Sequence, residues 1–360
     1  MRTGKIVTFE GAGKKMKLQE KTLPELQNGE VLIKNLYTTI CGSDLHTFCG
    51  LRNEKTPTVL GHEIVGRIVS IHQSHPGHDH SGKKLNEGDL VTWTVFCSDP
   101  ESIWSHRGMP QKAPGLFKYG HAQITGEDAF HGGLAEYCVL KAHTAILKIP
   151  ETLPLPTAAT INCALATVAG AIRLAGNLQG KNVLITGMGL LGMVCVAMCR
   201  EEGVACVFGA DISQNRLQQA LSFDVDETIL METKDDTATL QLDDRTVDVV
   251  FDMSGAPTAM EAGLEVLHVG GIAVWIGAVF NNRKVQVDAE QVIRRLITIR
   301  GLHNYNYDDF KYAVDFIVEH HKKYPFDKVV SKEFSLDETE QAFTYAIKHK
   351  PLRVGIKIER

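Results

Sequence analysis

The sequence lacks several features that would place it in a special class of protein. No Lys/Arg block is long enough to indicate a nucleic-acid partner, and the net charge of the 360 residues is −5. The first residues contain no apolar run of signal-peptide length. One charge-free run, Val183–Cys199, is shorter than the roughly 20 residues that cross a bilayer. We therefore expect a cytoplasmic protein with no nucleic-acid partner and no membrane span.

Disulfide bonds are also not expected. The chain has eight cysteines, and without a secretory leader we expect them to be reduced thiols that serve as packing residues, metal ligands or catalytic groups. The polar, turn-rich segment Val95–Gly115 has Cys97 near its start but contains no second cysteine. A closed structural metal site needs about four ligands, and His106 would add at most one. This segment, here called the lobe, therefore predicts no structural metal.

The composition is that of an ordinary globular protein, with 44% hydrophobic and 22% charged residues. A chain of this length usually forms two domains. Up to Pro150, short apolar runs alternate with Gly, Pro and Asn, which is typical of a β-rich domain such as a barrel or sandwich. Beyond Pro156, predicted strands and helices alternate, which indicates a parallel, doubly wound sheet. The predicted fold class is therefore α/β with a β-rich first domain.

A glycine-rich turn between a predicted strand and a predicted helix indicates a dinucleotide site. The segment GMGLLG contains Gly187, Gly189 and Gly192 in a G-x-G-x-x-G pattern, together with Leu190 and Leu191. The three glycines permit a tight turn, close approach of a pyrophosphate and close packing of the helix on the strand. The helix N-terminus then faces the phosphates.

The next predicted strand ends at Asp211, which favours NAD over NADP. A carboxylate at this position accepts hydrogen bonds from the adenosine ribose hydroxyls and repels a 2′-phosphate. Arg216 lies close by in the sequence and could receive that phosphate, so NADP stays an alternative.

Two short segments, TTICGSDLH and GHEIVG, concentrate polar residues between apolar strands. Cys41 and His62 are ligand types that zinc prefers, but they are far apart in the sequence, so only the fold could bring them together. Taken singly, a buried thiol and a hydrogen-bonded core histidine are the simpler interpretations. Other polar residues lie beside them, however: Ser43, Asp44, His46 and Glu63. Polar groups at this density need a function or mutual partners.

Together these motifs resemble the zinc-dependent medium-chain alcohol dehydrogenases over nearly the whole chain. The matching segments are CGSDLH at 41–46, GHE at 61–63, EGDLV at 87–91, GGLAEYCVL at 132–140 and GMGLLG at 187–192. The resemblance implies a GroES-like catalytic domain and a Rossmann NAD-binding domain. It divides the chain into residues 1–156 (catalytic domain, first part), 157–301 (Rossmann domain) and 302–360 (return to the catalytic domain).

The resemblance also implies a catalytic zinc site. Cys41, His62 and Cys163 match the zinc ligands, and Glu63 matches an acid near the metal that exchanges with water as a ligand. Asp44 matches the carboxylate that orients the zinc-binding histidine. One catalytic zinc per chain is expected, without a structural zinc.

Further roles are implied for the proton relay and the cofactor. Ser43 and His46 match the residues that carry the substrate proton to solvent. Arg353 resembles a basic residue that approaches the pyrophosphate. Gly277 and Val279 lie in a segment that resembles the strand end whose backbone binds the nicotinamide carboxamide.

The implied reaction is hydride transfer between nicotinamide and a small alcohol or carbonyl at the zinc. The segments 162–176, 107–121 and 292–305 resemble a subgroup associated with phosphonate metabolism, which suggests a hydroxyalkyl or oxoalkyl phosphonate as substrate. Candidate groups for its dianion are Lys118, His121, His131, His303 and Asn304. The alternatives are a secondary-alcohol or polyol dehydrogenase of the sorbitol or threonine type, and a non-catalytic NAD-binding protein.

Three smaller expectations complete the analysis. The segment 283–287 resembles one that pairs across a dimer in this family, so a homodimer or homotetramer is expected. Packing should hold the lobe through four apolar side chains, those of Ile103, Trp104, Met109 and Leu116. A His-rich segment, with His72, His75, His78 and His80, is interpreted as an exposed loop rather than a second metal site.

Overall fold

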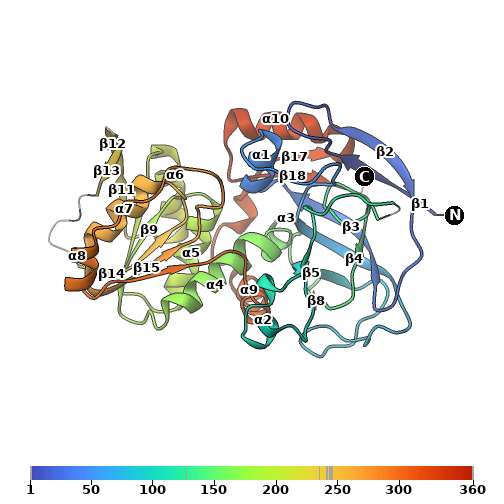
Figure 1. Cartoon of the computed structure of the whole chain (residues 1–360), viewed down its shortest axis with the longest axis horizontal. Helices are drawn as coiled ribbons and strands as arrows, with labels where there is room; N and C mark the ends of the chain where they lie inside the picture. The colour runs from blue at the N-terminus through green and yellow to red at the C-terminus, as the bar shows by residue number, and fades with distance from the viewer. Residues whose placement is uncertain (1, 127, 235, 241, 243–245, 359–360) are drawn as a thin grey trace. The chain divides into compact units, whose positions relative to one another are not determined.

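The computed structural model describes residues 2–126, 128–234, 236–240, 242 and 246–358. The chain forms two compact units, which Figure 1 shows in colours that follow the sequence. The first unit comprises Met1–Ala166, Asn306–Lys322 and Phe326–Arg360. The second unit comprises Thr167–Tyr305 and Lys323–Pro325.

An eight-stranded curled sheet forms the centre of the first unit. Its strands are β3 (Val31–Thr39), β4 (Glu63–Ile71), β5 (Leu90–Cys97), β6 (Phe117–Lys118), β7 (Tyr137–Leu140), β8 (Thr144–Lys148), β17 (Val330–Ser335) and β18 (Arg353–Lys357). The order is β17-β18-β3-β4-β5-β6, with β7 paired to β3 and β8 paired to β5. Only β17 and β18 pair in parallel; the other described pairs are antiparallel. A separate antiparallel pair is β1 (Thr3–Thr8) and β2 (Lys17–Thr22).

Short helices complete the first unit. They are α1 (Gly42–Phe48), α2 (Ile103–His106), α3 (Leu155–Ala158), α9 (Tyr307–His320) and α10 (Thr339–His349), with 3-10 turns η1 (Pro110–Lys112), η4 (Phe326–Lys328) and η5 (Leu336–Glu338) and a π-helical turn, η2 (Ile161–Leu165). The described C-terminal part of the chain returns to this unit because β18 pairs with β3. Residues far apart in the sequence therefore share one core, including Ile6, Leu60, Phe130 and Phe343.

The second unit is a parallel α/β sheet. Its strands follow the order β11 (Glu227–Leu230), β10 (Cys206–Asp211), β9 (Asn182–Thr186), β14 (Val247–Asp252), β15 (Leu267–Trp275) and β16 (Thr298–Gly301). Its helices are α4 (Ala166–Ala175), α5 (Leu190–Glu201), α6 (Gln214–Ala220), α7 (Pro257–Val266) and α8 (Ala289–Arg294), with a turn η3 (Leu221–Phe223). A small hairpin joins β12 (Glu232–Lys234) to β13 (Thr237–Thr239). The predicted α/β class, with a doubly wound sheet and a β-rich unit, is confirmed.

One described segment, Leu155–Ala175, is long and apolar enough to cross a membrane. Most of it is buried inside the structure, which is the behaviour of a core helix. The charge-free run Val183–Cys199 comprises most of strand β9, the glycine turn and most of α5, which is the predicted order of strand, turn and helix.

The lobe contains α2 and η1, and Cys97 at the end of β5 leads into it. Burial raises the pKa of the Cys97 thiol to about 11, as expected for an inert, protonated side chain. The prediction that four apolar side chains hold the lobe is wrong for two of them, because Ile103 is 57% and Met109 37% exposed. Polar contacts are present instead: the Ser102 side chain accepts a hydrogen bond from the Ser105 amide at the start of α2.

Candidate metal centre and cofactor site

Three metal-ligand side chains converge in the first unit. Cys41 precedes α1, His62 precedes β4, and Cys163 lies in the π-helical turn η2. Their ligand atoms lie within 4.8 Å of one another, and the two sulfur atoms are 4.0 Å apart. Tetrahedral zinc with Zn–S bonds of about 2.3 Å holds two sulfurs about 3.8 Å apart. Two thiols and an imidazole at this spacing fit a zinc ion, and three protein ligands are the number typical of catalytic zinc sites.

Asp44 connects two of these side chains. Its carboxylate accepts hydrogen bonds from the Cys41 amide at 3.0 Å and from the Gly61 amide at 3.3 Å. The same carboxylate lies 3.3 Å from Nδ1 of His62. Burial opposes a charge on His62, but Asp44 outweighs it and the pKa of the imidazole is raised. Asp44 therefore holds His62 with its Nε2 available to a metal, the arrangement common around metal-binding histidines.

The π-helical turn gives Cys163 its position. The structure places this turn, which is wider than an α-helical one, between α3 and α4; such turns occur often at functional sites. Asn162 in this turn accepts a hydrogen bond from the Ile64 amide at 3.2 Å, which ties the turn to β4 directly after His62. The sequence analysis did not identify Asn162, because an amide in an apolar helical segment carries no recognisable motif.

The two thiols of the cluster differ in protonation. The hydrogen bond between them lowers the pKa of Cys41 well below its ordinary value and raises that of Cys163. The Arg353 guanidinium, whose Nη2 lies 3.7 Å from Sγ of Cys41, also lowers the pKa of Cys41. One thiolate is thus favoured before a metal arrives, and thiolate is the form that binds metal.

Glu63 and Arg353 form a buried ion pair beside Cys41. Arg353 donates from Nε and Nη2 to the two carboxylate oxygens of Glu63 at 2.7 and 2.8 Å. Their side chains are 0% and 7% exposed, and the Thr39 hydroxyl also donates to Glu63. The sequence analysis assigned Arg353 to the cofactor and Glu63 to intermittent metal binding. In the structure the Arg353 guanidinium and the Glu63 carboxylate are bonded to each other. Glu63 lies outside the three-residue ligand cluster.

Helix α1 carries the two residues of the predicted proton relay. The Ser43 hydroxyl lies 3.3 Å from Nε2 of His62, at the ligand cluster. His46 lies three residues later, and residues at this spacing share one face of a helix. Burial lowers the pKa of His46, so the imidazole is neutral and can accept a proton at neutral pH.

In the second unit, the predicted glycine turn joins β9 to α5. Gly187 has φ = +91°, and a Cβ there would lie 2.7 Å from the Ser254 amide. A Cβ at Gly192 would lie 2.1 Å from the Gly187 carbonyl oxygen, so both positions require glycine. A Cβ at Gly189 would meet nothing within 4 Å. Gly189 therefore leaves an open approach at the N-terminus of α5, which begins with Leu190 and Leu191.

Asp211 lies at the carboxyl end of β10 and is buried. Its carboxylate accepts hydrogen bonds from the Met188 amide of the glycine turn at 2.7 Å and from the Ser213 amide at 2.8 Å. Arg216 in α6 has its Nη1 3.9 Å from the same carboxylate. The acid and the base that bear on NAD or NADP preference therefore lie beside each other, next to the glycine turn.

A second buried carboxylate, Asp252 at the end of β14, was missed by the sequence analysis. It accepts hydrogen bonds from the Thr186 hydroxyl at 2.9 Å and from the Gly255 amide at 2.9 Å, and its burial raises its pKa. These bonds join the carboxyl ends of β9 and β14. Gly277 packs against this turn, since a Cβ there would lie 2.2 Å from the Gly255 amide, and Val279 beyond it is 41% exposed.

The five candidates for binding a dianion are divided between the two units. His121 stacks on His62 with ring centroids 4.8 Å apart, and Lys118 precedes it by three residues. His131 is fully buried, and its burial lowers its pKa to about 4, so it is a core residue. His303 and Asn304 belong to the second unit.

The histidines of the segment 72–80 make local turn contacts. The His72 ring bonds the Ser74 hydroxyl, His75 accepts from the Gly77 amide, and His78 bonds the Pro76 carbonyl. Over the described ranges, the ligand cluster found is that of Cys41, His62 and Cys163.

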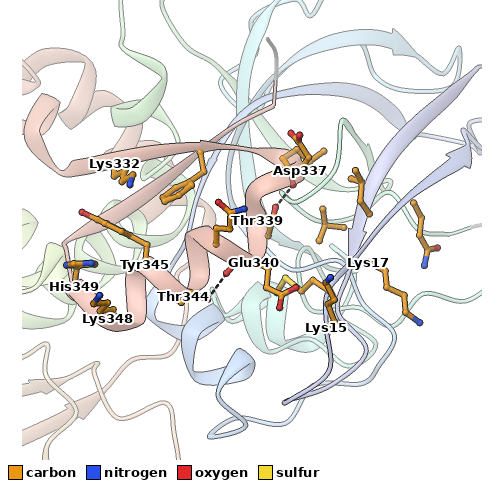
Figure 2. Close-up of a pocket in the computed structure, with 17 residues that line it drawn as sticks. Lys15, Lys17, Lys332, Asp337, Thr339, Glu340, Thr344, Tyr345, Lys348 and His349 are labelled. Carbon is orange, nitrogen blue, oxygen red and sulfur yellow. Dashed lines mark hydrogen bonds between the residues drawn. The ribbon is translucent and has the colours of Figure 1, made fainter.

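A separate groove of about 1070 Å³ lies in the first unit, between β2 and α10 (Figure 2). Lysines, threonines and the Tyr345 ring line it, and Lys332 lies over that ring. None of the predicted site residues lines this groove.

Comparison with known proteins matches both units. Residues 27–151 match the model of the alcohol dehydrogenase GroES-like domain, and residues 191–319 match that of the zinc-binding dehydrogenases. D-arabitol-phosphate dehydrogenase of Enterococcus avium is 30% identical over 93% of this chain and 92% of its own length. L-threonine 3-dehydrogenase of Pyrococcus horikoshii is 30% identical over 91% and 90%.

Solved structures show the same fold. An alcohol dehydrogenase from Thermotoga maritima superposes with a TM-score of 0.91 at 24% identity over the full length of both chains. A protein described as a zinc-binding dehydrogenase from Sinorhizobium meliloti, bound to NADP, gives 0.86 at 22% identity over 99% and 100%. The chain belongs to the zinc-type medium-chain alcohol dehydrogenases, oxidoreductases that act on CH–OH groups and combine a GroES-like with a Rossmann domain.

Proposed function

We propose that the protein is a zinc-dependent, NAD(H)-linked dehydrogenase that interconverts a small alcohol and its carbonyl compound. The observation that carries this proposal is the convergence of Cys41, His62 and Cys163 at zinc-like spacing. We also propose that residues 1–156 and 302–360 form the catalytic domain and residues 157–301 the cofactor domain. The expected occupancy is one zinc per chain, with none in the lobe.

When bound, zinc supplies a Lewis acid that lowers the pKa of the substrate hydroxyl, and nicotinamide supplies the hydride acceptor. The chain supplies orientation and proton transfer. Asp44 fixes the His62 ring through its contact with Nδ1. Ser43 Oγ, beside the ligand cluster, would accept the hydroxyl proton and pass its own proton through the cofactor ribose to the neutral His46 imidazole and then to solvent. Arg353 neutralises Glu63, so that no uncompensated carboxylate lies beside Cys41.

The cofactor assignment rests on the glycine turn. The open face at Gly189 and the N-terminus of α5 would accept the pyrophosphate. Asp211 would bind the adenosine ribose and favour NAD, whereas Arg216 would favour NADP if it turned away from Asp211. Gly277 and Val279 are the remaining proposed cofactor contacts.

The proposed substrate is a hydroxyalkyl or oxoalkyl phosphonate. The relative D-arabitol-phosphate dehydrogenase is named for a phosphorylated polyol. A phosphate monoester resembles a phosphonate because both carry a dianionic group. A neutral polyol, or an amino-acid alcohol as in the threonine dehydrogenases, is the second candidate. In either case the protein would work as a homodimer or homotetramer, and exposed apolar side chains in and around α8 support this.

Metal analysis combined with turnover tests the proposal. We expect one zinc per wild-type chain, and Cys163→Ala should lose both the metal and the oxidation of alcohols. Cys97→Ala is the matched control, since it removes the lobe thiol and should keep one zinc and full activity. Two zincs per wild-type chain would contradict the assignment of the lobe. A fully metallated and active Cys163→Ala would contradict the assignment of the site, and NADH binding without turnover would favour a non-catalytic protein.

A further inference from the structure

We propose that His121 is a positioning residue for the candidate metal ligand His62, and that Glu54 and Arg52 hold the His121 ring in place. This inference rests on the proposed zinc site and adds to it the residues that keep one ligand oriented. Arg52 and Glu54 belong to no motif in the sequence; their contacts in the fold identify them.

Two different contacts hold the His62 ring. At its edge, a carboxylate oxygen of Asp44 lies 3.3 Å from Nδ1. On its face, the His121 ring packs with centroids 4.8 Å apart and an interplanar angle of 33°, within the range of paired rings. The edge contact selects the nitrogen that stays available to a metal, and the face contact restricts rotation of the ring about its Cβ–Cγ bond. Together they fix the direction of Nε2.

Glu54 fixes the His121 ring in turn. Its Oε1 accepts a hydrogen bond from Nδ1 of His121 at 2.9 Å, and Nε of Arg52 lies 2.9 Å from the same oxygen. Burial alone would raise the pKa of Glu54, but the hydrogen bond from His121 and the charge of Arg52 lower it, so the carboxylate is ionised. Hydrogen bonds to an ionised acceptor are the strong ones. The side chains of Arg52, Glu54 and His121 are only 23%, 12% and 11% exposed, so the arrangement is not a mobile surface cluster.

The backbone beside His121 packs directly on the backbone beside His62. Gly120 has φ = +74°, and a Cβ there would lie 2.4 Å from the Gly61 carbonyl oxygen and 3.1 Å from Cβ of His62. The Gly120 amide also bonds the His131 carbonyl at 2.7 Å. The two rings are therefore held together by their main chains as well as by Glu54.

Both contacts on His62 lead back to helix α1, which begins directly after Cys41. Asp44, in the first turn of α1, accepts a hydrogen bond from the Cys41 amide at 3.0 Å. Beyond the other end of α1, the Arg52 amide bonds the His46 carbonyl at 3.2 Å. The edge contact thus starts from the first turn of α1, and the face contact from the segment that follows it. One closed series of contacts holds Cys41 and His62 relative to each other, and loss of the face contact opens it.

Zinc release from the loaded protein and the absorption spectrum of its Co²⁺-substituted form test this role. His121→Ala should release zinc to a colorimetric chelator about 10- to 100-fold faster than wild type, the usual effect of losing a group that orients a metal ligand. The visible d–d bands of the Co²⁺ form should also shift, because they depend on the geometry of the ligands.

Variants of Glu54 separate the ring from its anchor. Glu54→Ala should speed zinc release by a smaller factor than His121→Ala. Glu54→Gln should recover most of that loss, since an amide oxygen still accepts a hydrogen bond from Nδ1 of His121. His106→Ala, which removes a lobe histidine whose side chain is 62% exposed, is the control and should match wild type.

A lower melting temperature of His121→Ala with wild-type zinc release and a wild-type Co²⁺ spectrum would show a merely structural role and overturn the inference. If His121→Ala does not fold, Glu54→Ala and Glu54→Gln carry the comparison, and wild-type release from both would overturn it. Neither measurement uses turnover. Zinc binding without oxidation of any alcohol would overturn the proposed dehydrogenase, and the release rates would still decide the role of His121.

Discussion

Buried charged side chains are the most sensitive parts of the metal centre. Glu63 has no exposed surface, and its two oxygens are bonded by Arg353 and Thr39. Removing one partner of a buried ion pair leaves the other charge without compensation, which is strongly destabilising. The family resemblance names both residues but gives them unrelated roles. Their pairing joins residues 290 positions apart, and no sequence pattern reports it.

His131 illustrates the same principle for a neutral group. It is fully buried, its ring nitrogens have no described hydrogen-bond partner, and its burial lowers its pKa to about 4. The unfolded chain binds a proton near pH 6.5 and the folded chain does not, so stability falls as the pH falls from about 6.5 to about 4. The difference between these pKa values corresponds to about 3 kcal/mol.

We expect His131→Leu to remove this part of the pH dependence. Urea unfolding of wild type and variant near pH 7.5 and near pH 5 measures it. The wild type should lose about 1 to 3 kcal/mol more than the variant at the lower pH. His78→Leu, at an exposed histidine, is the control and should unfold with the wild-type pH dependence. Parallel losses in wild type and His131→Leu would show that this side chain is not the cause.

At the scale of elements, the junctions between strands and helices carry the two sites. The carboxyl ends of β9, β10 and β14 meet through the carboxylates of Asp211 and Asp252, which bond backbone amides of the glycine turn and of the turn after β14. In the first unit, α1, β4 and η2 each contribute or adjoin one of the three candidate metal ligands. The glycine pattern predicted the junction between β9 and α5, because each glycine in it has a local steric reason. The π-helical turn had no such signature.

The glycine turn gives a prediction that separates folding from cofactor binding. Gly192→Ala should destabilise the protein, because the new Cβ would lie 2.1 Å from the Gly187 carbonyl oxygen. Gly189→Ala meets nothing within 4 Å, so its melting temperature should stay near that of wild type. NADH binding to Gly189→Ala should nevertheless weaken at least tenfold, since the methyl group would obstruct the pyrophosphate.

Melting curves and NADH fluorescence titration measure the two effects. Gly301→Ala, which also meets nothing within 4 Å, is the control and should change neither. Wild-type NADH affinity in Gly189→Ala would show that the cofactor does not approach this turn.

At the scale of the whole molecule, the second unit leaves apolar surface uncovered. Ile293 is 72%, Leu296 71% and Val287 44% exposed, in and around α8. The neighbouring β16 is an edge strand of the sheet, and edge strands and apolar patches are sites of association. These observations agree with the expected pairing through the segment 283–287.

We expect Ile293→Asp combined with Leu296→Asp to convert a dimer or tetramer into smaller species. Light scattering after size-exclusion chromatography measures the mass of each. Leu221→Asp, which changes an exposed leucine in η3, is the control and should keep the wild-type mass. A wild-type monomer, or an unchanged mass in the double variant, would contradict the proposed interface.

The sequence by itself determined the fold class and the family, because periodicity, glycine spacing and short polar motifs are local properties. It also named the candidate metal ligands that the structure brings together, although only through a resemblance, since Cys163 lies 122 residues from Cys41. Tertiary structure decided what depends on contacts between distant segments: the Glu63–Arg353 pair and the support from Asn162 and Asp252. Such contacts arise when the chain folds back on itself, and no local pattern records them.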